Sequence, residues 1–516
     1  MTERQRLLAG AAALLVVPAT IAFALATRHG LALDGDAATY LDLARSIRLG
    51  DGPTLTGFGA FEPTPSTHFP PLFPAWLAAV GTARWGNWLL LITSCVLMVA
   101  AVMRTTVLWD MRSFTSAIVA LMAAIGVTCV ALHPDAQATF AAVGSEALFV
   151  PLMLGAVLAT LARRPWWVAG LVALALLTRH VGIALLVLPI FAAERRWWSV
   201  GLLASAAAAL PYLTWRWWVA WQGVPPDRIG RWHGLTRWDL GDSLQTFARW
   251  ILPTPHDVPI NGFWLAMGFL VFATFGYLCW SRRELIALIA AYLAVVLVAK
   301  ATVDQHIPLG GRIWFPLLFL LPIAVSARTF HRIEQRRRKR QRLLDDGQYD
   351  DVYESLTADH ARGDVEPSKL AKPFLSIVLM SMMAALLGGI VFTLDRFRHG
   401  AGYASPDWTT SPTLAWVEQQ PTSTTIRSDA ADSIHVLLRR PAMFLPKSRF
   451  ETAGRPNTRR FDQLRDLRGS GATFVFFTSV DRDYFVTAED VRRLLDVEEV
   501  ARFDDGFVLR EVAFSR

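Results

Sequence analysis

Repeated apolar runs constrain this chain more than any other feature, since each is close to the length that crosses a bilayer. A transmembrane helix needs about 20 mainly apolar residues. Here 53% of the 516 residues are hydrophobic and only 18% are charged, whereas soluble proteins carry about 25% charged residues. We therefore predict a multi-pass α-helical membrane protein with about 11 transmembrane helices. The predicted spans are residues 8–27, 87–103, 114–132, 144–162, 166–177, 181–193, 198–218, 262–280, 285–301, 311–327 and 373–394.

The basic residues near the ends of these spans predict the orientation of the chain. Short loops rich in Lys and Arg stay on the cytoplasmic side of a membrane. The basic run at 336–340 falls on the same side as the other arginine-rich ends. We therefore expect a cytoplasmic N-terminus and an external segment 395–516 in the plasma (inner) membrane of the cell. The other basic ends carry Arg4, Arg6, Arg104, Arg112, Arg163, Arg164, Arg195, Arg196, Arg282 and Arg283.

The net charge of +8 follows mostly from that orientation. Juxtamembrane basic clusters meet anionic lipid headgroups, so membrane lipids are the predicted partners of the run at 336–340, and nucleic acid is not. The chain contains no Gly-x-x-x-x-Gly-Lys loop, Gly-x-Gly-x-x-Gly fingerprint or His-Glu-x-x-His motif, which argues against nucleotide and zinc-protease chemistry. Soluble nucleotide sugars are not expected at an external active site. An activated group would therefore arrive on a lipid carrier that crosses the membrane.

Composition divides the chain into four predicted parts. Residues 1–328 form a helical transmembrane domain with an external loop at 28–86, and 329–372 form a basic and polar cytoplasmic linker. The last transmembrane helix, 373–394, leads to a small external α/β domain at 395–516. Runs of β-branched and aromatic residues predict its strands, and Asp-Asp-Gly at 504–506 predicts a hairpin. Strands are expected near 424–428, 472–477, 498–503 and 507–512, and helices near 430–438 and 488–496.

Four segments with polar residues stand out against the apolar background. They are residues 36–45 after the first span, the Pro-rich run at 70–74, and the segments 177–182 and 312–318. Their order and topology resemble the GT-C superfamily of membrane glycosyltransferases. The resemblance is greatest to the family 39-like branch, which contains the protein O-mannosyltransferases and the lipid A aminoarabinose transferases. It extends over roughly residues 8–328.

The resemblance implies transfer of a sugar from a polyprenyl-phosphate donor to a glycan, lipid or protein acceptor at the outer face of the membrane. The family's Asp, four residues before a Tyr, is Asp36 here, and the Tyr is Tyr40. Ala37 stands where the family usually has Glu, so Asp34 is the nearest substitute carboxylate. This departure means that the acceptor class cannot be carried over from the family.

Asp36 is our candidate for the catalytic base. A phosphate leaving group needs little help from an acid, whereas the attacking hydroxyl needs a base near the anomeric carbon. The alternative interpretations are a solvated loop residue and the N-cap of a helix that begins near Ala37. Asp34 is assigned a supporting or metal-binding role. Tyr40 and His68 are grouped with it as supporting or acceptor-binding residues.

Cations at the outer ends of the spans are the candidates for binding the donor phosphate. They are Arg179, His180, Lys300 and Arg312. Ionisable residues at membrane depth are functional candidates, and arginine binds phosphate through a planar, bidentate fork. The alternative is that these side chains extend to the lipid headgroups. The family's Lys-Pro-Pro segment has Phe69 in the Lys position, with His68 beside it, so carrier contact by Lys does not carry over.

Glu146 and two His/Asp pairs leave further alternatives open. Glu146 opens a span from the outside and could bind acceptor hydroxyls, pair with Arg179, or act as an N-terminal helix charge. The pairs His133 with Asp135 and His256 with Asp257 could ligate a metal. Such isolated pairs in loops are usually solvated, so no metal site is assigned, and a divalent metal stays a possible cofactor.

A multi-pass transporter and a non-catalytic scaffold of envelope assembly are the alternative functions. A transporter typically has ionisable residues near the middle of the membrane and repeated halves. In this chain the ionisable residues gather at the outer ends of the spans and no halves repeat. A scaffold would need no carboxylate beside a cluster of cations. Turnover of a polyprenyl-phosphate sugar separates the three functions.

Overall fold

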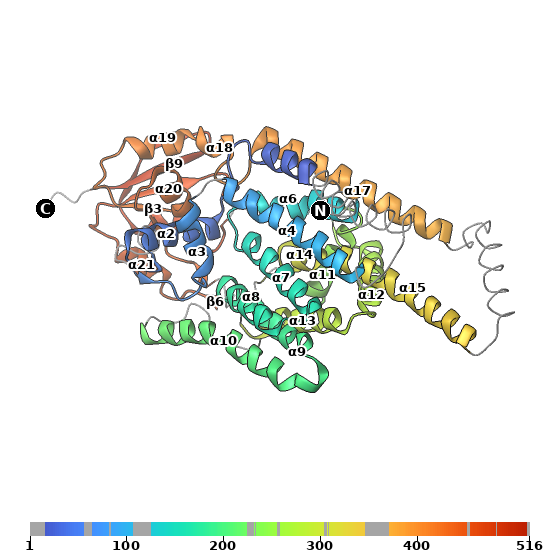
Figure 1. Cartoon of the computed structure of the whole chain (residues 1–516). Helices are drawn as coiled ribbons and strands as arrows, with labels where there is room; N and C mark the ends of the chain where they lie inside the picture. The colour runs from blue at the N-terminus through green and yellow to red at the C-terminus, as the bar shows by residue number, and fades with distance from the viewer. Residues whose placement is uncertain are drawn as a thin grey trace.

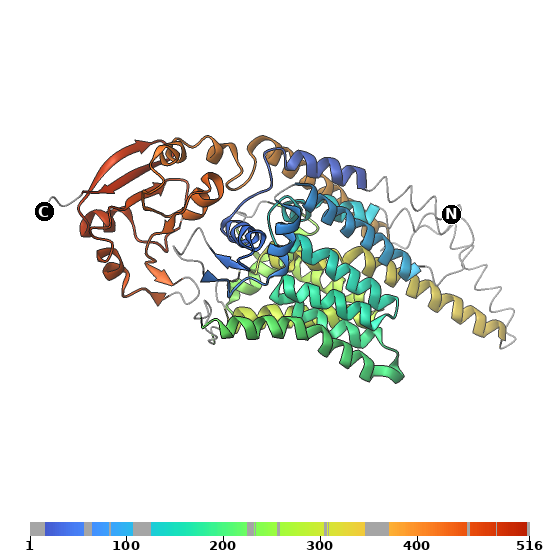
Figure 2. The same cartoon turned by 60° about the vertical axis from the view of Figure 1, so that its left-hand side comes forward.

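The computed structural model is mostly helical, with a β-sheet near the C-terminal end of the chain (Figure 1). Helix α2 lies between that sheet and the bundle of long helices in both views (Figures 1 and 2). The structure describes residues 16–55, 64–81, 84–106, 125–223, 232, 234–254, 259–303, 307, 309–345, 371–450, 455–480 and 482–512.

The bundle consists mainly of apolar helices. Its labelled elements are α4 (Arg84–Thr106), α7 (Glu146–Leu161), α8 (Pro165–Thr178), η1 (His180–Val187), α9 (Leu188–Ala192), α10 (Trp198–Trp221), α12 (Gly262–Cys279), α13 (Arg283–Thr302), α14 (Gly311–Leu318), α15 (Leu321–Asp345) and α17 (Ala371–His399). Two shorter helices, α6 (Pro134–Phe140) and α11 (Arg237–Arg249), pack among them. Residues 16–26 and 125–132 are also helical.

Four helices in the described part of the chain are long and apolar enough to cross a membrane, by length and composition. They are Arg84–Thr105, Gly262–Cys279, Arg283–Thr302 and Gly311–Arg332. Four shorter apolar helices accompany them, at Val16–Ala26, Glu146–Leu161, Pro165–Thr178 and His180–Ala192. The multi-helical character is therefore confirmed, whereas the number of 11 spans stays a prediction.

Two of the predicted continuous spans are interrupted. The span at 181–193 is a 3-10 helix followed by the short helix α9, and Pro189 in α9 has no N–H to continue the preceding ladder. The span at 311–327 is divided between α14 and α15 by a turn at 319–320. Pro322, the second residue of α15, likewise lacks a backbone donor.

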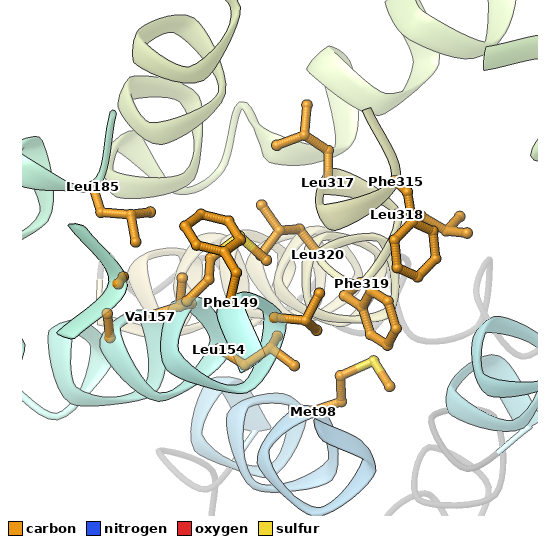
Figure 3. Close-up of a cluster of buried hydrophobic side chains, with 14 of the residues drawn as sticks. Met98, Phe149, Leu154, Val157, Leu185, Phe315, Leu317, Leu318, Phe319 and Leu320 are labelled. Carbon is orange, nitrogen blue, oxygen red and sulfur yellow. The ribbon is translucent and has the colours of Figure 1, made fainter. Parts of the chain in front are cut away.

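Side chains from several helices meet in the core of the bundle (Figure 3). Phe149 and Leu154 on α7 approach Leu320 and Phe319, which lie at the junction of α14 and α15. All four side chains are fully buried. Helix α7 also packs against α4 and α8, so its first residue is held firmly with respect to the rest of the bundle.

The predicted external loop at 28–86 contains two helices. They are α2 (Gly35–Leu49) and α3 (Leu72–Val80), which pack against each other, and strands β1 (Thr54–Leu55) and β2 (Thr64–Pro65) pair between them. Helix α15 continues to Asp345, so the first part of the predicted linker at 329–372 is helical, and residues 346–370 lie outside the described chain.

The C-terminal segment forms a five-stranded sheet in the order β4-β3-β7-β9-β8. Strands β3 and β7 are parallel, and β9 runs antiparallel to β7 and β8. The strands are β3 (Ile426–Ser428), β4 (Met443–Phe444), β7 (Thr473–Phe477), β8 (Val497–Phe503) and β9 (Gly506–Glu511). The helices of this segment are α18 (Pro406–Thr409), α19 (Pro412–Gln419), α20 (Ala431–Leu438), α21 (Arg460–Arg465) and α22 (Ala488–Leu494), and β5 (Arg449–Phe450) pairs with β6 (Arg455–Pro456).

Strand β7 is central because both of its faces are buried. Val475 and Phe477 belong to one hydrophobic cluster, and Phe474 and Phe476 belong to another on the opposite face. Successive side chains of a strand point to opposite faces, so a fully apolar strand of this kind needs cover on both sides. The four predicted strands and two predicted helices lie within two residues of their expected ends, whereas β4, β5, β6, α18, α19 and α21 were not predicted. The status of 395–516 as a separate external domain stays a prediction.

Candidate active site

The segment that precedes α2 is held between two distant parts of the chain. The Ala32 N–H donates to the carbonyl of Ala141 at 2.7 Å, and the Tyr403 N–H donates to the carbonyl of Leu33 at 2.9 Å. Gly402 has a φ of +52°, and a Cβ there would lie 2.0 Å from the Leu33 oxygen, so glycine is required. These contacts determine where α2 begins.

Asp34 and Asp36 occupy the start of α2. The Asp34 carboxylate caps the helix by accepting from the Ala37 N–H at 2.8 Å. The alternative interpretation of Asp36 as the N-cap is therefore wrong, because the helix begins two residues earlier than expected. Asp36 lies in the first turn, and its side chain is 46% exposed.

Arg312, the second residue of α14, brings three carboxylates together. Its Nη1 lies 3.1 Å from Oδ2 of Asp36 and 3.8 Å from Oδ2 of Asp34. Its Nε contacts Oε1 of Glu146, and its Nη2 donates to Oε2 of Glu146 at 3.3 Å. The planar guanidinium has donors on more than one edge, so one side chain binds Glu146 and the start of α2 at the same time.

Glu146 is the buried anchor of this group. It is 2% exposed, and its Oε1 also contacts Nη1 of Arg179. A buried carboxylate needs charged partners to offset the loss of hydration. The expected pairing of Glu146 with Arg179 is confirmed, and Glu146 is also the first residue of α7. We call Asp34, Asp36, Glu146, Arg179 and Arg312 the Arg312 cluster.

Tyr40 supports the cluster from within α2. Its hydroxyl donates to Oγ of Ser145 at 3.0 Å, directly before Glu146 in the chain. The rings of Phe69 and Phe73 both lie 4.8 Å from the Tyr40 ring. Burial raises the pKa of the Tyr40 hydroxyl, which keeps it a hydrogen-bond donor. This buried geometry favours the supporting role over direct acceptor binding.

His68 and His180 meet beside these aromatic side chains. The ring centroids of the two histidines lie 6.2 Å apart, and Nε2 of His180 hydrogen-bonds the His68 carbonyl at 2.9 Å. Nδ1 of His180 hydrogen-bonds the Tyr212 hydroxyl at 2.8 Å. Both ring nitrogens of His180 are thus engaged within the protein. A phosphate would have to displace one of these contacts to bind His180, so its phosphate-binding role stays a prediction.

Lys300 is engaged elsewhere. Its Nζ pairs with Oδ1 of Asp239 at 3.0 Å and donates to the Ile307 carbonyl at 2.9 Å. Its side chain is 9% exposed. The structure therefore brings Arg179 and Arg312 together but engages Lys300 in a different ion pair.

Of the two His/Asp pairs considered as metal ligands, only His133 with Asp135 lies in the described part of the chain. His133 accepts from the Asp135 N–H through Nδ1 at 3.2 Å and approaches the Arg249 carbonyl through Nε2 at 3.2 Å, so it caps α6. His256 and Asp257 lie outside the described residues. Within the described chain, no group of three or more His, Cys, Asp and Glu residues is placed to hold a metal ion. The Arg312 guanidinium occupies the position between the three carboxylates of its cluster.

Three contributing residues were not assigned from the sequence. Tyr292 is buried, and its hydroxyl donates to the Ile313 carbonyl at 2.8 Å, directly after Arg312. Ser145 accepts from Tyr40, and Asp239 pairs with Lys300. A polar hydroxyl inside an apolar run was the available signal for Tyr292. Thr236 followed by Asp239 is a capping-box pattern, which locates the start of α11.

The cluster has the parts that a group transfer at a phosphate requires. Asp36 is a partly exposed carboxylate that can accept a proton, and Arg312 presents a 43% exposed guanidinium side chain next to it. Glu146 is more deeply buried and holds Arg312 in place, and Arg179 pairs with the same carboxylate. A base and a phosphate-binding cation therefore lie side by side, on elements that the rest of the fold positions separately.

Comparison with solved structures identifies the fold. ArnT from Cupriavidus metallidurans bound to undecaprenyl phosphate superposes with a TM-score of 0.56 over 97% of this chain and 98% of that chain, at 14% sequence identity. The apo state of the same protein superposes with a TM-score of 0.55 over 98% of each chain, also at 14% identity. The oligosaccharyltransferase of Archaeoglobus fulgidus, tethered with an acceptor peptide, is 10% identical and has a TM-score of 0.42 over 84% of this chain and 63% of its own.

No protein-family model matches the chain, and none of the curated proteins matches its sequence. ArnT belongs to the GT-C superfamily. The near-complete superposition on ArnT confirms that the chain has a GT-C fold, as the sequence resemblance implied.

Proposed function

We propose that this protein is a membrane glycosyltransferase that moves a sugar from a polyprenyl-phosphate donor to an acceptor at the outer face of the cell membrane. The acceptor is a glycan, lipid or protein of the envelope. One observation carries the proposal: on a GT-C fold, the partly exposed carboxylate of Asp36 lies 3.1 Å from the Arg312 guanidinium. The bound undecaprenyl phosphate of ArnT supports a donor of the same chemical kind.

The reaction assigns a separate task to each side of the cluster. The acceptor hydroxyl loses its proton to Asp36 as its oxygen attacks the anomeric carbon. The bond from that carbon to the phosphate oxygen breaks, and its electron pair stays on the phosphate. Arg312 stabilises this leaving group, because a guanidinium forms charge-assisted hydrogen bonds with phosphate oxygens. Asp34 keeps the start of α2 in place as the cap.

The deeper residues of the cluster keep Arg312 in position for this task. Two guanidinium groups repel each other, and Glu146 lies between them. Without a carboxylate at that place, Arg179 would lose the ion pair that offsets its burial, and Arg312 would keep only its contacts with Asp36 and Asp34. We therefore assign Glu146 a positioning role, and we assign phosphate binding first to Arg312, whose side chain is 43% exposed, and second to Arg179 at 21%.

The orientation proposal follows from the positive residues and from the fold. The basic part of α15 and the C-terminal sheet lie at opposite ends of the helical bundle in both views (Figures 1 and 2). If the basic end is cytoplasmic, the Arg312 cluster and the C-terminal sheet both face the outside. This placement suits a donor carried across the membrane by its lipid.

Asp36→Asn tests the proposed function. We expect the purified full-length protein in nanodiscs to release radiolabelled sugar from a polyprenyl-phosphate carrier in the presence of envelope glycolipid. The variant should lose about 100-fold or more of this rate, because the amide cannot take the proton and general-base catalysis contributes 10²- to 10⁴-fold. Asp51→Asn, which alters an exposed carboxylate beyond the end of α2, is the matched control.

Two outcomes would contradict the proposal. An Asp36→Asn protein that keeps more than about a tenth of the rate would exclude Asp36 as the base. Absence of sugar release by the wild-type protein, with carrier and acceptor both present, would favour a scaffold function.

A further inference from the structure

A cavity of about 390 Å³ lies in the C-terminal segment, apart from the Arg312 cluster. It opens between strand β3, the chain after β4, and the end of α21. Among the described residues, its lining has two cations, Arg427 and Lys447, one carboxylate, Asp466, and the amides of Asn457 and Gln463. Its apolar side chains are Phe444, Pro446 and Leu467. A mixed lining of this kind suits a sugar, which has polar hydroxyls and apolar ring faces.

Arg427 stands out in this cavity because it has no ionic partner among the residues that the structure describes. Its Nε is buried and has no hydrogen-bond partner within the described chain. Its Nη1 donates only a long hydrogen bond, of 3.4 Å, to the Phe444 carbonyl. No carboxylate of the described residues forms an ion pair with it, in contrast to Arg482 and Arg449 of the same segment, which pair with Asp432 and Asp483.

The cost of this arrangement is visible in the ionisation of Arg427. Burial lowers the pKa of its guanidinium. A partly buried cation without an anion is unfavourable unless another molecule supplies the anion. Asn457, by contrast, is satisfied, since its Nδ2 donates to the Lys447 carbonyl at 2.8 Å and to Oε1 of Gln463 at 2.9 Å. Asn457 in the wall of the cavity is therefore fully hydrogen-bonded, whereas Nε of Arg427 has no partner among the described residues.

We propose that this cavity binds a sugar bearing a negative charge, a phosphate or a carboxylate, with Arg427 contacting the charged group. Phe444 and Leu467 contact the apolar face of the ring, and Asn457 and Gln463 lie within the wall that meets its hydroxyls. Assigning this sugar to the acceptor rests on the proposed glycosyl transfer, whereas the binding itself does not.

The position of Phe444 connects the cavity to the start of α2. The Arg482 guanidinium lies 5.5 Å from the centre of the Phe444 ring. Arg482 pairs with Asp432 at 2.7 Å, and Oδ2 of Asp432 lies 3.1 Å from the place of a Cβ on Gly35. A few side-chain contacts thus separate the cavity from the helix that carries Asp36. An extended anionic acceptor could occupy the cavity with one unit and present another near the Arg312 cluster.

Calorimetric titration of the full-length protein in detergent micelles tests the proposal without any donor present. The probes are glucose 6-phosphate, glucuronate and uncharged glucose, which separate phosphate, carboxylate and sugar-ring recognition. We expect at least one charged sugar to bind about tenfold or more tightly than glucose, since hydrogen bonds to charged groups are stronger than those between neutral groups. Arg427→Gln should reduce that affinity about tenfold, and Arg427→Lys should reduce it less because the charge is kept.

Arg465→Gln is the matched control, because it removes the same charge from a 59% exposed side chain that does not line the cavity. Equal affinity for charged and uncharged sugars, or no binding of any probe at millimolar concentration, would overturn the proposal. So would unchanged affinity in both Arg427 variants. Binding that persists in a protein without sugar transfer would retain the cavity as an anionic-sugar site and reject only the proposed function.

Discussion

At the scale of single residues, the chemistry depends on how Arg312 divides its donors. Its Nε and Nη2 bind the buried Glu146, whereas Nη1 points to Asp36 and Asp34. Only a guanidinium can serve both sides at once, because an ammonium is a single point of charge. Arg312 is therefore both a structural link and the proposed contact for the donor phosphate.

Arg312→Lys separates those two functions. The charge remains, but the bidentate contact with Glu146 is lost, so we expect affinity for a short-chain polyprenyl-phosphate sugar to fall about tenfold. Arg312→Ala should weaken binding further. Binding is measured in nanodiscs. Arg338→Lys is the control, because the side chain of Arg338 on α15 is 72% exposed. Unchanged affinity in both Arg312→Ala and Arg179→Ala would move the phosphate site away from this cluster.

At the scale of elements, α2 is held along its length by the C-terminal segment. Near its start, Gly35 faces Asp432, which is bound by Arg482 and by the Tyr403 hydroxyl at 2.7 Å. Further along the helix, Oδ1 of Asp42 lies 3.2 Å from Nε2 of His435 on α20, and both side chains are buried. The helix that carries the proposed base is therefore held by contacts with a distant part of the sequence.

Arg482→Gln tests this support for α2. Loss of the guanidinium leaves the buried Asp432 without its ion-pair partner, so the start of α2 should shift. A misplacement of about 1 Å can reduce catalysis about 100-fold, and we expect the transfer rate to fall while donor affinity changes little. Arg449→Gln, which breaks an exposed pair with Asp483, is the control. Equal rates in the two variants would show that α2 does not depend on this contact.

Asp429, at the end of β3, makes the C-terminal sheet sensitive to pH. Burial raises the pKa of its carboxyl to about 6, against the lowering effect of the Phe477 N–H that it accepts. The unfolded value is about 3.9, so the folded state retains the proton to higher pH. This contribution is most favourable below about pH 4 and is lost as the pH rises toward 6.

The prediction concerns how the stability of the wild-type protein differs from that of Asp429→Asn as the pH changes. Relative to Asp429→Asn, the wild-type protein should lose stability between about pH 4 and pH 6 and remain constant above that range. Thermal unfolding in detergent, followed by the near-ultraviolet signal of the aromatic residues, measures the difference. A gap between the two melting temperatures that does not vary with pH would contradict the raised pKa.

At the scale of the whole molecule, the arrangement implies a single orientation in the membrane. The basic end of α15 and the C-terminal sheet lie at opposite ends of the bundle (Figure 1). The three cysteines of the chain are buried, so an impermeant thiol reagent should give little background. Asp407 on α18 is exposed and is therefore a suitable position for an introduced cysteine. Gly400 is less suitable, because its φ of +67° disfavours any other residue.

We expect Asp407→Cys to be labelled in intact cells and Arg338→Cys to be labelled only after the cells are opened. The physical reason is that Arg-rich ends stay in the cytoplasm. Labelling is detected by a shift in gel mobility, and each variant is compared with the unmodified chain. Labelling of Arg338→Cys in intact cells would reverse the orientation and place the Arg312 cluster inside.

Local patterns in the sequence determined much of the architecture. Apolar runs placed most of the described bundle helices, and β-branched and aromatic runs placed β3, β7, β8 and β9, because both signals depend on neighbours within a few residues. They suggested the start of α2 only as an alternative, and they did not resolve α3 in the predicted loop or the breaks at Pro189 and after α14. The position of Asp36 after the first span, together with the GT-C resemblance, indicated the candidate base.

Only the tertiary structure decided which charges meet. Glu146, Arg179 and Arg312 come from the ends of three helices, and Asp36 comes from a fourth element. The sequence indicated each of them as a candidate, yet it did not show that Arg312 binds both Asp36 and Glu146, or that Lys300 pairs with Asp239 instead. Such pairings depend on how packed helices bring distant residues within a few ångströms, and no local period in a sequence encodes that distance.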